Sequence, residues 1–201
     1  MVARLGSVGR LTDQRTVSAY PHRVDGSLGG IPLRTPDGEP TSLAQFRDGW
    51  LVLQLVRYFG CLPCQEWLIE LDRRRTALAE LGVQVAAVGG SADYQARWLA
   101  SERAVTMPLL LDPEQSLRAA LDLGIPLGWR LLDPRGLASY ATNLARGRRP
   151  QAITHDTVRS PAVVVLDPGL VPRWRFEGRR IGDYPSHAAV VTAVQRLLAG
   201  T

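Results

Sequence analysis

Two cysteines lie two residues apart in the segment Cys61-Leu62-Pro63-Cys64, and the 201-residue chain has no others. An apolar run, 50–56, precedes them, and a stretch with helical spacing follows. A cysteine at a helix start lies beside unpaired backbone N–H groups and the positive end of the helix dipole, and both lower its pKa. Because the thiolate is the reactive form of cysteine, this layout predicts redox chemistry at Cys61.

The neighbouring residues predict distinct roles for the two thiols. Cys64 lies inside the first helical turn, more shielded than Cys61, and we expect it to resolve whatever Cys61 becomes bonded to. Pro63 suits a first turn, because its missing N–H costs nothing there. Arg57 ends the preceding strand and is placed to add positive charge, and we expect Arg57 and Tyr58 to tune the thiolate.

Three other interpretations of the cysteine pair are weaker. A zinc site needs two more ligands, and the three histidines (His22, His155 and His187) lack ligand-like spacing, so we expect no metal and no other cofactor. Two inert core cysteines would not need Pro63 or the strand–helix context. A static disulfide would close too short a loop to stabilise the fold much.

Composition narrows the class of protein. All 24 basic residues are arginine, which excludes a Schiff-base or phosphate-loop lysine, and the net charge is +5. No run reaches the roughly 20 apolar residues of a membrane span, and no leader-like apolar region follows Met1, so we expect a cytoplasmic protein without a membrane partner. The arginine clusters favour a solvated face over a nucleic-acid partner, because acidic residues are interleaved and aromatic residues are sparse.

Strand and helix patterns alternate along the chain. Strands are expected at 50–58, 83–88 and 107–111, with a hairpin at 162–166 and 171–176, and helices at 65–81, 91–103, 114–123 and 186–199. This order predicts an α/β fold, a three-layer α/β/α sandwich with a central mixed β-sheet. We expect residues 1–27 to form an N-terminal lead-in and 28–201 one domain, with an insertion at about 124–157 that contains a short helix at 140–146.

A second candidate piece of the site is Ser160-Pro161, which precedes the strong β run 162–166. In a thioredoxin-like fold a cis-proline occupies this place and faces the Cys-x-x-Cys. We therefore predict a cis bond at Pro161 that presents backbone to the disulfide of a substrate or partner. An ordinary trans proline that opens a strand is the alternative.

Five stretches of the sequence form a recognisable pattern: 35–38, 56–64, 108–113, 163–168 and 178–185. On these segments, residues 28–199 resemble the peroxiredoxin-like branch of the AhpC/TSA family. This resemblance implies a thioredoxin-like fold and a peroxiredoxin-like antioxidant enzyme. The chain departs from the family pattern where Gln54 takes the place of a proline, Tyr58 that of a threonine and Pro161 that of an arginine. A thioredoxin-type buried acid is replaced by Leu55, with Glu66 as a possible substitute proton acceptor for Cys64.

These observations predict a thiol-dependent oxidoreductase. In the favoured mechanism the Cys61 thiolate reduces a hydroperoxide and becomes a sulfenic acid, and Cys64 condenses with it to an intramolecular disulfide. A thioredoxin-type or low-molecular-weight thiol then reduces the disulfide. The alternatives are a thioredoxin-like enzyme that exchanges protein disulfides and a non-catalytic redox sensor. A homodimer is compatible with either mechanism.

Overall fold

The computed structural model describes residues 28–90, 92–154 and 159–200 of the chain. The predicted lead-in, 1–27, and Ser91, the predicted first residue of a helix, lie outside the described residues. Within them, no helix is both long enough and apolar enough to cross a membrane.

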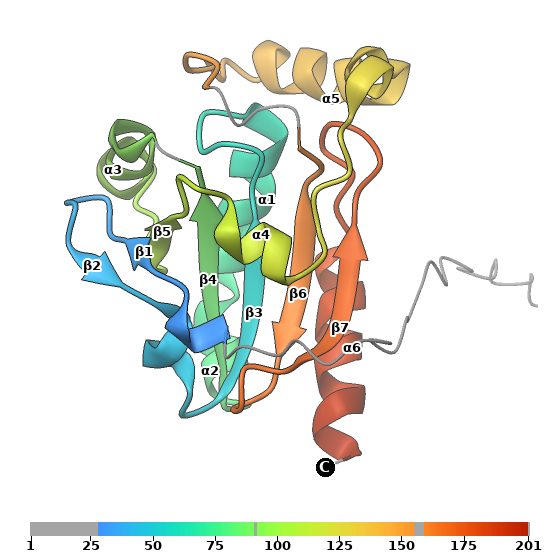
Figure 1. The fold of residues 1–201 in the computed structure, drawn as a ribbon. Helices are drawn as coiled ribbons and strands as arrows, with labels where there is room; N and C mark the ends of the chain where they lie inside the picture. Colours follow the sequence, from blue (N-terminus) through green and yellow to red (C-terminus); the bar gives the residue numbers. More distant parts are fainter. Residues whose placement is uncertain (1–27, 91, 155–158, 201) are drawn as a thin grey trace, which may run out of the picture.

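A seven-stranded mixed sheet forms the centre of the fold, in the order β2-β1-β5-β4-β3-β6-β7 (Figure 1). The central pairs β3–β4 and β4–β5 are parallel, and the other pairs are antiparallel. The strands are β1 Leu33–Arg34, β2 Pro40–Thr41, β3 Trp50–Leu55, β4 Val83–Gly89, β5 Leu109–Leu111, β6 Ala162–Leu166 and β7 Pro172–Glu177. The predicted mixed sheet and the hairpin at its edge are confirmed.

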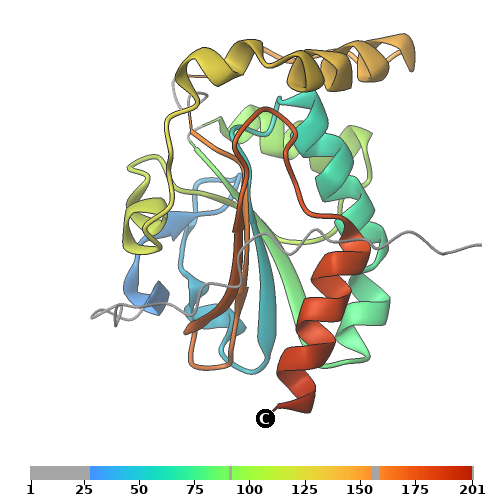
Figure 2. The same ribbon diagram turned by 90° about the vertical axis from the view of Figure 1, so that its right-hand side faces the viewer.

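Helices cover both faces of the sheet (Figure 2). The α-helices are α1 Leu62–Arg73, α2 Arg75–Ala79, α3 Asp93–Glu102, α4 Ser116–Ala120, α5 Pro134–Ala145 and α6 His187–Ala199, and the 3-10 helices are η1 Leu28–Gly30, η2 Leu43–Phe46 and η3 Gly128–Leu132. Helices α1, α2, α3 and α6 pack on one face, and η1, η2 and α4 on the other. The three-layer sandwich predicted from the sequence is confirmed.

The central strand β3 shows why the sheet is buried on both sides. Val52 faces the cluster beneath α1, whereas Leu51, Leu53 and Leu55 face the cluster beneath α4. Successive side chains of a strand point to opposite faces, so a run that is apolar at every position must lie between two covered faces. This strand carries the chain directly to the cysteine segment.

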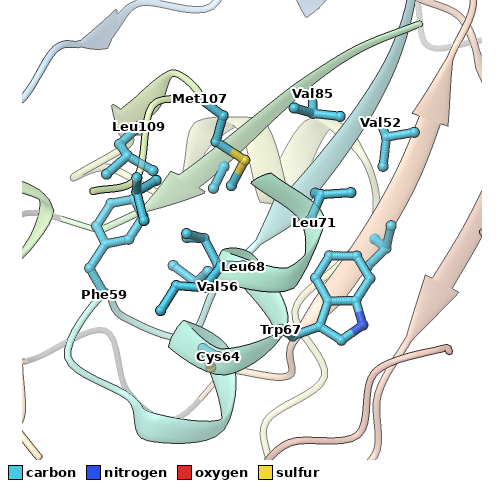
Figure 3. Packing of buried hydrophobic residues seen from close by; sticks show 14 of the residues in the cluster. Val52, Val56, Phe59, Cys64, Trp67, Leu68, Leu71, Val85, Met107 and Leu109 are labelled. Atoms are coloured by element: carbon cyan, nitrogen blue, oxygen red, sulfur yellow. The ribbon is translucent and has the colours of Figure 1, made fainter. Parts of the chain in front are cut away.

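The cluster beneath α1 fixes the loop between β3 and the cysteines (Figure 3). Phe59 packs there with Val56 and Leu68. Its ring lies so close to Gly89 that a Cβ on residue 89 would stand 2.5 Å from the ring, so the strand end must be glycine for Phe59 to enter the core. The buried ring holds the loop that leads to Cys61.

Three helix predictions were wrong in their extent. The helix expected over 114–123 is confined to α4, Ser116–Ala120. The helix expected over 65–81 begins at Leu62 and breaks at Arg74, and the break lets α2 lie against β4 with Leu78 buried. The short helix expected at 140–146 is α5, which begins at Pro134 because Asp133 caps it: the Asp133 carboxylate accepts the backbone N–H groups of Arg135 and Gly136. Helix α5 lies across the end of the molecule above the start of α1 (Figures 1 and 2).

Candidate active site

Both cysteines lie at the start of α1. Cys61 is the N-cap residue, with extended backbone, and Pro63 occupies the first turn, as the sequence predicts. Cys64 lies one turn inside and packs into the core cluster (Figure 3). The two are not joined in a disulfide, and neither exposes measurable surface, although Cys64 was expected to be the more shielded of the two.

Polar side chains lock the loop that presents Cys61. The Gln65 amide donates to the Phe59 carbonyl at 2.8 Å, and the Gln95 amide oxygen accepts the Gly60 N–H at 2.9 Å. The Cys61 N–H in turn donates to the Tyr58 carbonyl at 3.2 Å. These bonds occupy the backbone groups of a buried loop and leave its side chains in one arrangement.

The thiol of Cys61 is set up as a thiolate. Burial opposes its ionisation, but a hydrogen bond from Cys64, the charge of Arg57 and a hydrogen bond from Tyr140 outweigh burial and lower the pKa of Cys61 to about 6. Arg57 Nη1 lies 3.6 Å from the Cys61 sulfur and is itself buried. A buried guanidinium stays charged, and the nearby thiolate is its counter-charge.

The pKa of Cys64 is shifted in the opposite direction. Burial raises the pKa of Cys64 well above its ordinary value, and its hydrogen bond to Cys61 adds to the rise. The Tyr184 hydroxyl is a buried polar neighbour of this thiol. The Gln54 side chain lies beside that hydroxyl, and its amide donates to the Cys64 backbone carbonyl at 3.2 Å. Cys64 is therefore the protonated partner that donates to Cys61.

Tyr140 of α5 is a site residue that the sequence did not predict. Its hydroxyl lies 3.2 Å from that of Tyr58 and bonds the Cys61 sulfur. Burial and the neighbouring thiol raise the pKa of Tyr140, so the hydroxyl stays protonated and remains a donor. The helix signal at Asp133-Pro134 was visible in the sequence, but no local pattern pointed from it to Cys61.

The segment 178–185 brings Tyr184 to the site. Gly182 adopts a positive φ of 69°, and a Cβ there would stand 2.8 Å from Pro63, so the segment lies directly on the start of α1. Trp67 donates to the Pro185 carbonyl at 2.8 Å and stacks on Tyr184, with ring centroids 5.0 Å apart. This segment carries part of the family resemblance, but its sequence does not predict a role for Tyr184.

The prediction of a cis bond at Pro161 was wrong: every peptide bond in the described residues is trans. The backbone around it is also occupied. Arg118 donates to the Ser160 carbonyl at 2.8 Å, the Ser160 N–H donates to Ile125, and Gly178 donates to the Pro161 carbonyl. These bonds hold the chain extended as it enters β6, the conformation that a residue before proline favours.

The hydrogen bonds of Ser160 and Pro161 thus serve to hold the fold together. The Ser160 hydroxyl bonds Glu177, and the backbone groups of the two residues bond Arg118, Ile125 and Gly178. Glu66, the possible proton acceptor for Cys64, instead pairs with Arg103 at 3.0 Å and Arg148 at 3.2 Å. Among the described residues no three potential metal ligands gather at one point.

Replacing the buried arginine tests the electrostatic part of the site. We expect Arg57→Gln to raise the pKa of Cys61 by about one unit or more, because an opposite charge beside an ionisable group shifts its pKa by that order. Thiolate absorbance or the pH dependence of alkylation measures the shift. Arg196→Gln on α6 is the matched control and should leave the pKa of Cys61 unchanged. An unchanged pKa in Arg57→Gln would show that Arg57 does not lower the pKa of Cys61.

Comparisons with known proteins agree with the fold. Peroxiredoxin Q of Xanthomonas campestris is 14% identical, with a TM-score of 0.60 over 87% of this chain and 94% of that one. Peroxiredoxin Q of Xylella fastidiosa is 15% identical, with a TM-score of 0.60 over 86% and 92%. Peroxidoxin BcpB of Mycobacterium tuberculosis is 16% identical, with a TM-score of 0.58 over 84% and 91%.

No curated protein matches the chain. Residues 30–171 match the family described as AhpC/TSA, which covers most of the sequence and includes Arg57, both cysteines and Tyr140. The predicted fold and the predicted class of enzyme, a peroxiredoxin-like thiol-dependent oxidoreductase, are thereby confirmed. The chain belongs to the AhpC/TSA family.

Proposed function

We propose that the protein reduces hydroperoxides, with Cys61 as the attacking thiol and Cys64 as the resolving thiol. The observation that carries the proposal is the opposite pKa shift of the two buried thiols: the pKa of Cys61 is lowered to about 6 and that of Cys64 is raised. Adjacent groups whose pKa values are pushed apart divide the roles of an active site between them. Near neutral pH Cys61 is a thiolate and Cys64 a thiol.

The chemistry takes two steps. The Cys61 sulfur attacks the terminal oxygen of the hydroperoxide, so that an S–O bond forms as the O–O bond breaks, and the leaving alkoxide takes up a proton to become an alcohol. The Cys64 sulfur then attacks the Cys61 sulfenic acid, which forms the disulfide and releases water. A thioredoxin-type dithiol supplies the two electrons that restore both thiols, which fits a reducing compartment such as the cytoplasm.

Two side chains are placed to assist the first step. Arg57 stabilises the thiolate, and the protonated Tyr140 hydroxyl can donate to the peroxide or to the leaving oxygen. The family pattern has a threonine where this chain has Tyr58, and the Tyr58 hydroxyl faces Tyr140. A hydroxyl therefore stands beside the sulfur even though the threonine is absent.

The Tyr140 hydroxyl is testable on its own. We expect Tyr140→Phe to slow the oxidation of Cys61 by roughly tenfold, since the phenyl ring keeps the packing but removes one donor. The pKa of Cys61 should also rise, because a hydrogen bond that lowers it is lost. Stopped-flow rates across pH separate the two effects. Thr142→Val, which removes an exposed hydroxyl from the same helix, is the control; equal rates for both variants would exclude Tyr140 from the reaction.

Burial favours a small peroxide over a protein disulfide. Cys61 has no exposed surface, and Tyr140 lies against it, so even a hydroperoxide needs a local displacement of α5 to enter. A protein disulfide would need a far larger opening of this reduced state, and the backbone of Ser160 and Pro161 is already bonded within the fold. Burial restricts only the oxidant in this way, because a thioredoxin-type reductant reacts with the oxidised state. Protein disulfide exchange therefore has no support from a specific contact.

Parallel reactions of the reduced protein test the function. We expect hydrogen peroxide and an organic hydroperoxide to oxidise Cys61 at least about a hundredfold faster than insulin or oxidised glutathione does, because only the peroxides reach a buried thiolate through a small opening. Quenched-flow alkylation of the remaining thiols measures all four rates. Faster oxidation by insulin would show that the protein exchanges disulfides instead.

A further inference from the structure

The segment 124–154 holds most of the chain's excess charge. It contains five arginines and one acidic residue, Asp133, a net charge of +4, against +5 for the whole chain. The carboxylate of Asp133 is used as the helix cap of α5, and Arg148 pairs with Glu66. The other arginines of the segment include Arg135, Arg146 and Arg149, all of which are exposed.

The same segment exposes most of the large apolar side chains. Of the nine that are exposed among the described residues, six lie here: Ile125, Trp129, Leu132, Leu137, Leu144 and Ile153. Three of these side chains are largely exposed to solvent: Trp129 is 78%, Leu132 73% and Ile153 77% exposed. Single exposed apolar residues are normal on a soluble protein, but six of the nine within 31 residues set this segment apart from the rest of the described chain.

Helix α5 buries little of itself against the rest of the fold. Only Gly136 and Asn143 are buried, Tyr140 is partly buried at the thiol, and Leu137 and Leu144 stay about half exposed. The helix lies across the end of the molecule and not within a layer of the sandwich (Figure 2). Trp129, Arg130 and Leu132 lie in η3, just before this helix. Tryptophan and leucine beside arginine are typical of a segment that lies in a membrane interface.

We propose that residues 124–154 bind the surface of an anionic lipid membrane and bring acyl-chain hydroperoxides to Cys61. Arginines attract anionic headgroups, while Trp129, Leu132 and Ile153 enter the boundary between headgroups and acyl chains. The Arg130 guanidinium stacks over Trp129, 5.8 Å from its ring centroid. This pair therefore presents a positive charge and a large apolar side chain together. The sequence expectation of no membrane partner rested on the lack of a spanning segment, which a surface-bound helix does not need.

A lipid surface fits these residues better than nucleic acid does. Phosphate contacts account for arginines but give no role to exposed leucine and isoleucine. The lipid surface also explains the position of the segment, because α5 carries Tyr140 to the Cys61 sulfur on its inner side. The choice of acyl-chain hydroperoxides rests on the proposed peroxidase function; the binding to lipid does not.

Vesicle binding by the full-length protein tests the proposal. We expect it to co-sediment with vesicles of phosphatidylcholine and phosphatidylglycerol, more weakly with phosphatidylcholine alone, and less at high salt. The double variant Arg135→Gln/Arg149→Gln should lose roughly fivefold in partition coefficient per charge. Trp129→Ser/Leu132→Ser should lose roughly tenfold or more. The control Leu81→Ser/Val171→Ser removes exposed apolar residues elsewhere and should bind like the wild type.

Four results would overturn the proposal. They are no co-sedimentation with anionic vesicles, the same loss in the control as in the Trp129 variant, a dimer in solution in which Trp129 is shielded from a quencher, and arginine-dependent binding to duplex DNA without vesicle binding. Measuring the oxidation of Cys61 by hydrogen peroxide separately from vesicle binding distinguishes this proposal from the proposed function. Vesicle binding by a protein whose Cys61 ignores every peroxide would refute only the peroxidase, whereas oxidation by hydrogen peroxide without vesicle binding would refute only the membrane surface.

Discussion

Cys61→Ser should lower hydroperoxide turnover by roughly 10³-fold or more, the order of loss seen when a catalytic nucleophile is removed. A serine hydroxyl is not ionised near neutral pH, so neither Arg57 nor Tyr140 can make it a nucleophile comparable with a thiolate of pKa about 6. Consumption of peroxide in the presence of a dithiol reductant measures the effect.

The fold should survive this substitution, since serine is nearly isosteric with cysteine and can keep the hydrogen bonds with Cys64 and Tyr140. Circular dichroism and thermal unfolding of the variant provide that control. Turnover within a few fold of the wild type, in a variant with an unchanged spectrum, would show that Cys61 is not the attacking thiol.

Cys64→Ser should leave the first oxidation nearly intact and abolish turnover with a thioredoxin-type reductant. The serine hydroxyl can still donate to the Cys61 sulfur, so the oxidation rate above pH 7 should stay within about threefold of the wild type. The sulfenic acid then has no neighbouring thiol with which to condense and accumulates.

Mass spectrometry after labelling with a sulfenic-acid reagent measures this accumulation, and one equivalent of peroxide should be consumed for each chain. Cys61→Ser is the matched control and should take up no label. If Cys64→Ser turned over with the protein reductant as fast as the wild type, the Cys61 sulfenic acid would be resolved by another group and the proposed disulfide would play no part.

The local half of the site was predictable from the sequence. The strand, the loop, Cys61 and the start of α1 follow one another along the chain, and their geometry depends on apolar periodicity and on Pro63 in the first turn. The charge of Arg57 at the sulfur follows from the same neighbourhood, four residues away. Sequence patterns predict this half because its contacts join residues that are close together in the chain.

The remote half of the site was not predictable. Tyr58 and Tyr140 meet across 82 residues, and Trp67 reaches the Pro185 carbonyl across 118. Their meeting depends on how α5 and the segment before α6 pack against α1, which periodicity within one element does not encode. The prediction of a cis bond at Pro161 was wrong for the same reason. Arg118 lies 42 residues from Ser160 in sequence and helps to hold the backbone there extended.

The pH dependence of wild-type oxidation tests the central claim most directly. Trp67 stacks on Tyr184 beside Cys64, so its fluorescence should report disulfide formation in stopped flow with hydrogen peroxide. Because only the thiolate reacts, the second-order rate constant should rise through a midpoint at pH about 6 and level off above it. A midpoint near about 8.5, the value of a free thiol, or no fluorescence change that depends on Cys61, would contradict the account.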